Sequence, residues 1–276
     1  MGITTLKELK TRKDEVLNDT QKLGLQYYDD INSRIPRAEI DQVNNAVGKI
    51  FEKLLGEDLV GAYEIVGSYR RKAATSGDID IIVTSVDGNP LLMHRLIDRM
   101  TELKMIKHKL TNGKTKVLVI GGLPDKHAAR RIDFLYSSPD EYPFATLYFT
   151  GSKYFNTAMR QHAVELGFSL NEHGIYKIQT GKKEKIPMVM TSEKDIFDFL
   201  GLEYVEPENR KDARSLKIIR EKTALPADKP KIQIKIEEKK ETKDTDTKQE
   251  MNIPSKLLEE FSKKGIKVLE KLSETE

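Results

Sequence analysis

Two aspartates separated by one apolar residue stand in a segment with the composition of a β-strand, Asp78 to Ile81. Residues i and i+2 of a strand point to the same face, so both carboxylates project together while Ile79 and Ile81 enter a core. A second strand-like segment, at residues 131–135, carries Asp133. Mg²⁺ prefers oxygen ligands, and three carboxylates beside substrate phosphate suit two ions roughly 4 Å apart. The pattern predicts two Mg²⁺ ions beside a nucleoside triphosphate, with Mn²⁺ able to substitute.

Glycine and serine occur together twice ahead of this segment, at residues 67–68 and 76–77. We expect a strand from Ala62 to Val66 to end in a turn, where glycine permits close backbone approach. Backbone N–H groups and hydroxyls at such turns can hold phosphate, and Arg70, Arg71 and Lys72 would add charge-assisted hydrogen bonds. An isolated Asp-x-Asp pair is commonly only solvated. The glycine-serine pairs and the basic residues make the spacing specific for a triphosphate site.

Composition narrows the protein class. The chain of 276 residues has no cysteine, which excludes disulfides and thiolate metal sites. No apolar run reaches the ~18 residues that a membrane span needs, and no secretory signal precedes the first charged segment. We therefore expect an intracellular, monomeric protein that is neither secreted nor in a membrane, located in the cytoplasm, the nucleus or a viral factory.

Charge is abundant but nearly balanced, with 33% charged residues and a net charge of only +3. Binding to nucleic acid would then depend on local basic surfaces and weaken steeply with salt. One candidate surface surrounds a predicted hairpin tip at residues 111–113 and includes Lys107 and Lys109; a second is the basic run at residues 181–185. Lysines are also common on solvated hairpin tips and sheet edges, so both explanations stay open for each surface.

Hydrophobic periodicity divides the chain into successive regions. Residues 1–38 show helical spacing at 5–13 and 20–34, which indicates a small helical lobe. Residues 39–138 alternate helices with strands expected at 63–66, 79–83, 115–120 and 131–135, and a helix at 90–104. A mixed sheet with helices on one side is the natural packing. In residues 139–214 the same periodicity predicts a helix at 152–166, followed by short strands at 168–170 and 175–178.

The composition changes after residue 214. Residues 215–252 are dominated by Lys, Glu, Asp, Thr and Pro, which predicts a disordered charged linker. In residues 253–276, Leu, Ile, Val and Phe are interspersed with lysines and glutamates. This pattern predicts an amphipathic helix. This helix either folds back on the body or binds a protein partner.

Several motifs together resemble one family. They are the strand aspartates, Gly24 to Tyr28, Arg34 to Arg37, Tyr148 to Ser152, and Ser192 to Asp198. Their order and spacing from about Leu6 to Arg210 are similar to those of the family X DNA polymerases in the nucleotidyltransferase superfamily. The resemblance implies an α+β fold: a nucleotidyltransferase palm, built as a mixed sheet with helices, flanked by a helical DNA-binding lobe and an α/β nucleotide-selecting lobe.

The resemblance also implies roles for individual residues. The metal ligands and catalytic residues would be Asp78, Asp80 and Asp133, with Asp133 nearest the primer 3′-hydroxyl. The residues that bind the deoxynucleoside triphosphate would be Arg34, Gly67, Ser68, Arg71, Ser76, Gly77, Tyr148, Phe149, Gly151 and Asn156. The DNA contacts would include Arg131 and Arg160, with Asn156 and Arg160 inspecting the nascent base pair.

The implied activity is DNA-directed DNA synthesis that fills short gaps during repair, with gapped or primer-template DNA and a dNTP as substrates. Family members with a repair lyase carry further amino-terminal modules; this chain begins after them, so lyase activity is not expected. Two alternatives stay open. One is a terminal transferase that adds nucleotides without a template, and the other is a non-catalytic scaffold that binds DNA ends.

Overall fold

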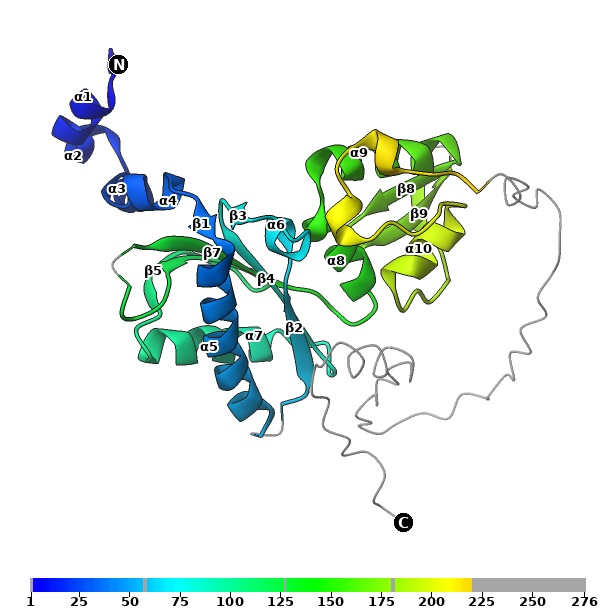
Figure 1. Cartoon of the computed structure of the whole chain (residues 1–276), viewed down its shortest axis with the longest axis horizontal. Coiled ribbons are helices and arrows are strands. Elements are labelled where there is room, and N and C mark those ends of the chain that lie inside the picture. Colours follow the sequence, from blue (N-terminus) through cyan, green and yellow to red (C-terminus); the bar gives the residue numbers. More distant parts are fainter. Residues whose placement is uncertain (1, 57–58, 127, 180–181, 220–276) are drawn as a thin grey trace.

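The computed structural model describes residues 2–56, 59–126, 128–179 and 182–219. Within these ranges the chain forms a small helical lobe, a palm on a five-stranded sheet, and a third lobe with its own three-stranded sheet (Figure 1). No helix in the described ranges has the length and apolar character needed to cross a bilayer. Most of the predicted charged linker and the whole predicted tail helix lie outside the described residues.

The helical lobe consists of four short helices, α1 Leu6–Thr11, α2 Lys13–Val16, α3 Asp19–Gln26 and α4 Tyr28–Asn32. Each of the two longer helices predicted here is broken, at Arg12 and at Tyr27, where the backbone leaves the helical region. Capping boxes at Thr5 and Asn18 begin α1 and α3. Leu25 is the only buried side chain in the four helices, so no packed apolar face holds a longer helix together.

The palm sheet has the strand order β2-β4-β7-β6-β5. Its strands are β2 Gly61–Ile65, β4 Ile79–Ser85, β7 Arg130–Tyr136, β6 Lys116–Gly121 and β5 Ile106–Asn112. The central pair, β4 and β7, is parallel, while the other neighbouring pairs are antiparallel. The predicted mixed sheet is therefore confirmed, as is the hairpin whose tip follows residue 112.

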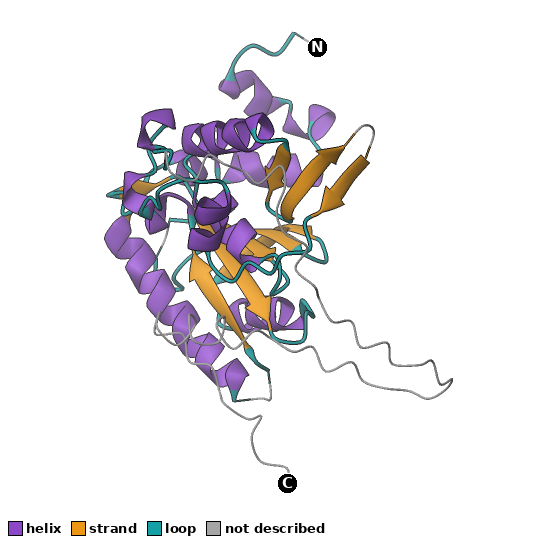
Figure 2. Cartoon of the chain, turned by 90° about the vertical axis from the view of Figure 1, so that its right-hand side faces the viewer, coloured by secondary structure: helices purple, strands orange, loops and turns teal. Residues whose placement is uncertain are grey.

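The two faces of the palm sheet differ. Ile81 and Phe134 point to one face and form a core with α5, Arg37–Leu55, and α7, Leu91–Glu102. On the opposite face Ile82 and Leu135 pack against α8, Tyr142–Thr150, which belongs to the third lobe. The prediction of helices on one side thus holds for the palm's own helices, and α8 covers part of the second face. Figure 2 shows these helices and strands from the side of the third lobe.

A short ribbon and buried polar contacts join the helical lobe to the palm. Strand β1, Ile35–Pro36, pairs with β3, Thr75–Ser76. Arg130 of β7 binds Glu39 of α5 through both carboxylate oxygens, at 2.7 and 2.9 Å. The same guanidinium donates to the Ser33 hydroxyl at 2.6 Å. The segment that leads from the helical lobe into the palm, residues 33–39, is therefore fixed against the palm sheet.

The third lobe packs its helices on a small antiparallel sheet. Its remaining elements are α9 Lys153–Glu165, β8 Phe168–Asn171, β9 Gly174–Gln179, β10 Lys182–Lys185, α10 Glu193–Phe199, and the 3₁₀ turns η1 Pro207–Asn209 and η2 Ala213–Ser215. A bridge between Leu202 and Ile218 extends this lobe to residue 219. Residues 217–219, assigned from the sequence to the linker, thus pair with residues 201–203.

The central strand predicts a stability difference. Ile81 is fully buried, so Ile81→Ala should lower the free energy of unfolding by about 2–4 kcal/mol through lost burial and a residual cavity. Ile178, which is 45% exposed, provides the matched substitution, and Ile178→Ala should cost less than about 1 kcal/mol. Urea unfolding followed by circular dichroism measures both. Equal losses would contradict the assignment of β4 to the core.

Candidate active site

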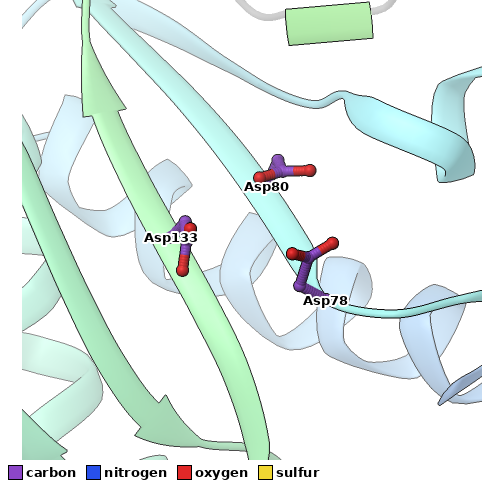
Figure 3. Close-up of side chains that lie close together, drawn as sticks. All are labelled: Asp78, Asp80 and Asp133. Atoms are coloured by element: carbon purple, nitrogen blue, oxygen red, sulfur yellow. The ribbon is translucent and has the colours of Figure 1, made fainter. Parts of the chain in front are cut away.

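The three predicted carboxylates meet on the face of the palm sheet opposite α5 and α7. Asp78 directly precedes β4, Asp80 lies within it, and Asp133 lies opposite Asp80 in the parallel β4–β7 register. One carboxylate oxygen from each of the three lies within 4.8 Å of the other two (Figure 3). The prediction that two strands place these side chains together is confirmed.

The donor set fits a hard divalent cation. All three groups offer oxygen, the ligand that Mg²⁺ and Mn²⁺ prefer. Asp133 Oδ1 is buried and accepts no hydrogen bond from the residues that the structure describes; its charged neighbour is Arg131 Nε, at 3.4 Å. A buried carboxylate oxygen without a donor is costly unless a cation or water satisfies it. The geometry therefore supports a metal site at Asp78, Asp80 and Asp133.

Burial also affects protonation at this site. Burial, reinforced by the charge of Asp133, raises the pKa of Asp80 to about 6, against the opposing effects of Lys116 and Arg71. Burial likewise raises the pKa of Asp133, although Arg131 and Lys116 act to lower it. Two close carboxylates resist ionising together without a cation beside them. The Arg131 guanidinium already lies beside Asp78 and Asp133, and a bound cation would offset the repulsion that remains.

Glycine is required where the backbone passes Asp80. Gly67 has φ of 61°, and a Cβ atom at this position would collide with Asp80 Oδ2. The predicted turn here is a one-turn helix, α6, Gly67–Arg70. Ser68 Oγ donates to Ser76 Oγ at 2.7 Å, and Ser76 is buried. Ser76 consequently supports Ser68 and does not itself line the cleft.

A cleft of about 670 Å³ separates the palm from the third lobe beside the carboxylates. The sequence-predicted residues that line it are Arg34, Gly67, Ser68, Arg71, Gly77, Asp78, Asp80, Tyr148, Phe149, Gly151, Asn156 and Arg160. Lys153 and Thr157 complete the lining, and nothing in the sequence alone assigned Thr157 to the site. The lining thus includes four basic side chains, which suit an anionic ligand, and two carboxylates; Asp133 lies outside it.

Hydrogen bonds fix several of these side chains. Arg34 donates to the Thr75 hydroxyl at 3.1 Å and to the Thr75 carbonyl at 2.6 Å. On the third lobe, Asn156 Nδ2 donates to the Tyr148 carbonyl at 2.6 Å, which joins α9 to the last turn of α8. Arg71 Nη1 donates to the Thr150 carbonyl at 2.5 Å, and burial lowers the pKa of Arg71. Arg71 therefore reaches from the palm to the third lobe across the cleft.

Three residues predicted to contact DNA do not line the cleft: Arg131, Lys107 and Lys109. The Arg131 guanidinium binds Asp78 Oδ2, and its Nε lies 3.4 Å from Asp133 Oδ1, so it already occupies the carboxylate cluster. Lys107 and Lys109 lie on the edge strand β5, outside the cleft lining. Lys109 forms a 3.3 Å ion pair with Asp98 of α7, on the sheet face opposite the carboxylates. Their predicted role in DNA binding stays a prediction.

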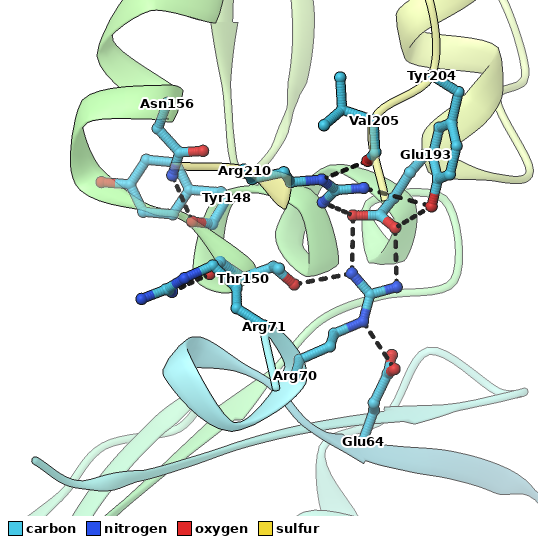
Figure 4. A network of polar contacts seen from close by, with 10 residues as sticks. All are labelled: Glu64, Arg70, Arg71, Tyr148, Thr150, Asn156, Glu193, Tyr204, Val205 and Arg210. Carbon is cyan, nitrogen blue, oxygen red and sulfur yellow. Dashed lines mark hydrogen bonds and ion pairs between the residues drawn. The ribbon is translucent and has the colours of Figure 1, made fainter. Parts of the chain in front are cut away.

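Two of the basic residues predicted to bind phosphate point away from the cleft. Arg70 binds Glu64 and Glu193 (Figure 4). Lys72 binds Glu208 at 2.7 Å. Arg70 is the last residue of α6 and Arg71 is its C-cap; the Arg70 guanidinium binds the buried Glu193, whereas Arg71 lines the cleft. The sequence therefore identified the basic run but assigned too many of its members to the site.

The mixed sheet, the clustered carboxylates and the cleft beside them define a protein of the nucleotidyltransferase class. The sequence model described as DNA polymerase beta palm matches residues 34–139, and the one described as DNA polymerase beta thumb matches residues 145–211. The chain belongs to the family X DNA polymerases. It matches the palm and thumb domains of that family, which correspond to the palm and the third lobe.

Individual relatives agree. The chain is 31% identical over 229 residues to DNA polymerase lambda of Arabidopsis thaliana, covering 76% of this chain and 42% of the relative. It is 31% identical over 212 residues to DNA polymerase lambda of Rattus norvegicus, covering 70% and 36%. It is 28% identical over 248 residues to DNA nucleotidylexotransferase of Xenopus laevis, covering 76% and 48%. The chain spans less than half the length of each of these relatives.

The raised pKa of Asp80 predicts that its ionised carboxylate lowers the stability of the metal-free protein. Asp80→Asn should stabilise the metal-free protein at pH 8 by about 1–2 kcal/mol, because it removes a buried charge. The folded-state pKa of about 6 lies above the ordinary value, so folding favours the protonated carboxyl. The wild type should therefore lose stability as pH rises through about 6, and the two proteins should converge near pH 4.

Urea unfolding in EDTA at several pH values measures this difference. Adding Mg²⁺ should raise the unfolding midpoint of the wild type more than that of the variant, since a ligand stabilises the state that binds it. A stability difference that does not change with pH would contradict a titrating buried carboxylate as its cause.

Proposed function

We propose that this chain is a DNA-directed DNA polymerase that fills short gaps, transferring a nucleotidyl group from a dNTP to a primer 3′-hydroxyl. One observation carries the proposal: a single cleft has Asp78 and Asp80, two of the three clustered carboxylates, on its palm side and Asn156 and Arg160 on its third-lobe side. The first group suits nucleotidyl transfer, and the second lies where a templated base pair would be inspected. Resemblance to the family supports the same roles for the two sides of the cleft.

The palm residues would bind and orient the reactants. Arg71, Ser68 and Arg34 would bind the triphosphate, with the guanidiniums stabilising charge on its oxygens. The carboxylate of Asp133, whose Oδ1 lacks a hydrogen-bond donor among the described residues, would lie nearest the primer 3′-hydroxyl. Two Mg²⁺ ions bound by Asp78, Asp80 and Asp133 would supply Lewis-acid activation of the hydroxyl and neutralise the leaving pyrophosphate. Catalysis would otherwise consist of positioning and charge stabilisation.

The third lobe would select the nucleotide. Tyr148, Phe149 and Gly151 line the cleft at the end of α8 and would restrict space around the sugar. Asn156, held by the Tyr148 carbonyl, and Arg160 would contact the minor groove of the nascent pair and the template. Closure of this segment on a correct pair would precede chemistry.

A template-independent terminal transferase is the second candidate, because the chain is also similar to a DNA nucleotidylexotransferase. The two candidates share the carboxylates and the triphosphate contacts. They differ in whether a template strand occupies the side of the cleft at Arg160. Product identity on different DNA substrates therefore distinguishes them.

The decisive measurement is Mg²⁺-dependent incorporation of each dNTP on a one-nucleotide gapped duplex, an open primer-template and a single-stranded primer. We expect only the complementary nucleotide to be added, and the gapped duplex to be preferred. Asp133→Ala should reduce incorporation by about 10³-fold or more, because metal binding and hydroxyl activation are both lost. Asp125→Ala, the same change at an exposed carboxylate, should retain wild-type activity.

Three results would contradict the proposal. Untemplated addition to the single-stranded primer would establish the terminal transferase. Normal incorporation by Asp133→Ala would exclude this carboxylate site. Absence of incorporation on every substrate would favour a DNA-end-binding scaffold.

A further inference from the structure

A groove of about 570 Å³ lies on the palm between α5 and α7. These helices cover the sheet face opposite the carboxylates, so the groove and the cleft are on different sides of the palm (Figure 1). The apolar residues that line the groove are Ala46, Ile50, Leu54, Leu103, Met105 and Pro124. Leu103 is 54% exposed. Exposed apolar surface that lines a groove commonly marks a contact with another segment or protein.

Charged side chains differ between the two edges of this groove. Lys49 and Lys53 lie on the α5 edge, and neither forms an ion pair with any residue that the structure describes. On the α7 edge, Arg99 pairs with Glu102 at 2.9 Å. The α5 edge is therefore positive, whereas the α7 edge is close to neutral.

Residues 254–272, which lie outside the described residues, have a sequence pattern that matches this groove. At 100° per residue, six apolar side chains of a helix over this range would lie within about 120° of one another. They are Leu257, Leu258, Phe261, Val268, Leu269 and Leu272. We call these six the tail stripe. It would be about 22 Å long, similar to the roughly 18 Å of α7.

The two edges of the tail stripe carry opposite charges. Glu259 and Glu270 would project beyond one edge of the stripe, and Lys264 and Lys271 beyond the other. Binding with the acidic edge beside the two lysines of α5 pairs opposite charges. The reverse orientation would place lysine beside lysine, so charge selects one orientation of the tail in the groove.

The intervening chain is long enough for this contact. Residues 220–253 connect the end of the third lobe to the tail stripe. A chain of this length extends to roughly 110 Å, whereas a folded body the size of residues 2–219 has a radius of gyration of about 17 Å. Tethering also raises the local concentration of the tail toward the millimolar range. A contact of modest affinity is then occupied within the chain.

We propose that residues 254–272 bind as an amphipathic helix in the groove between α5 and α7 of the same chain. The bound tail covers Leu103 and leaves the cleft open, because the groove is on the other side of the palm. Its apolar side chains are then hidden from other proteins. The proposal does not depend on the proposed polymerase function.

The first test measures the distance from the tail to α5 in the full chain. The chain has no cysteine, so Asn45→Cys, at an exposed position of α5, and Ser273→Cys provide unique sites for a fluorescent donor and acceptor. Single-molecule energy transfer should show one narrow population at high efficiency. Leu103→Asp in the groove and Phe261→Asp in the tail stripe should each lower the ratio of bound to unbound tail about tenfold or more, because each buries a charge.

Each of these substitutions has a matched control. Leu91, at the start of α7, is 42% exposed and does not line the groove, so Leu91→Asp should leave the ratio within about twofold of wild type. Ile266 would lie about 60° outside the tail stripe, so Ile266→Asp should also have little effect.

Three outcomes would overturn the proposal. A broad, low-efficiency distribution in the wild type would show that the tail does not bind its own body. Energy transfer between molecules that carry only one dye each would show that it binds a second copy. Sensitivity to Phe261→Asp without sensitivity to Leu103→Asp would show that it binds elsewhere on the chain.

Charge reversal tests the orientation and does not require a substitution in the apolar lining. Lys49→Glu combined with Lys53→Glu should lower the ratio of bound to unbound tail about tenfold. Adding Glu259→Lys and Glu270→Lys to the same chain should restore the ratio to within about twofold of wild type. If the losses add instead, the acidic edge does not lie beside α5, and the proposed arrangement is wrong.

Discussion

The parallel pairing of β4 with β7 is the interaction on which the rest of the site depends. It places Asp80 opposite Asp133, and the strand alternation brings Asp78 to the same face. The same alternation sends Ile79, Ile81 and Phe134 into the core with α5 and α7. The core thus holds together a cluster of like charges that repel one another.

The third lobe completes the cleft through contacts that are mainly polar near the site and apolar farther from it. Arg71 and Arg70 hold the end of α8, while Ala145 packs on the second face of the sheet. A buried polar contact has a narrower range of acceptable geometries than an apolar one, because unpaired groups are costly. The orientation of the third lobe relative to the palm therefore determines the shape of the cleft.

Features set by local periodicity could be predicted from the sequence, and features set by distant partners could not. The carboxylates follow from an i, i+2 spacing, and the hairpin from its turn. The direction of Arg70 depends on Glu64 and Glu193, which lie 6 and 123 residues away. The side taken by Lys109 depends on register shifts in β5 that interrupt simple alternation. The end of the third lobe depends on pairing between residues 201–203 and 217–219.

The one-turn helix α6 has an evolutionary consequence. Because Arg70 ends this helix and Arg71 caps it, inserting or deleting a single residue before them would displace both guanidiniums at once. The Arg71 side chain in the cleft lining and the Arg70 contacts between the lobes would be lost together. Gly67 prevents a side chain from entering on the other side, beside Asp80. This short segment can therefore vary in residue type at its exposed positions but not in length.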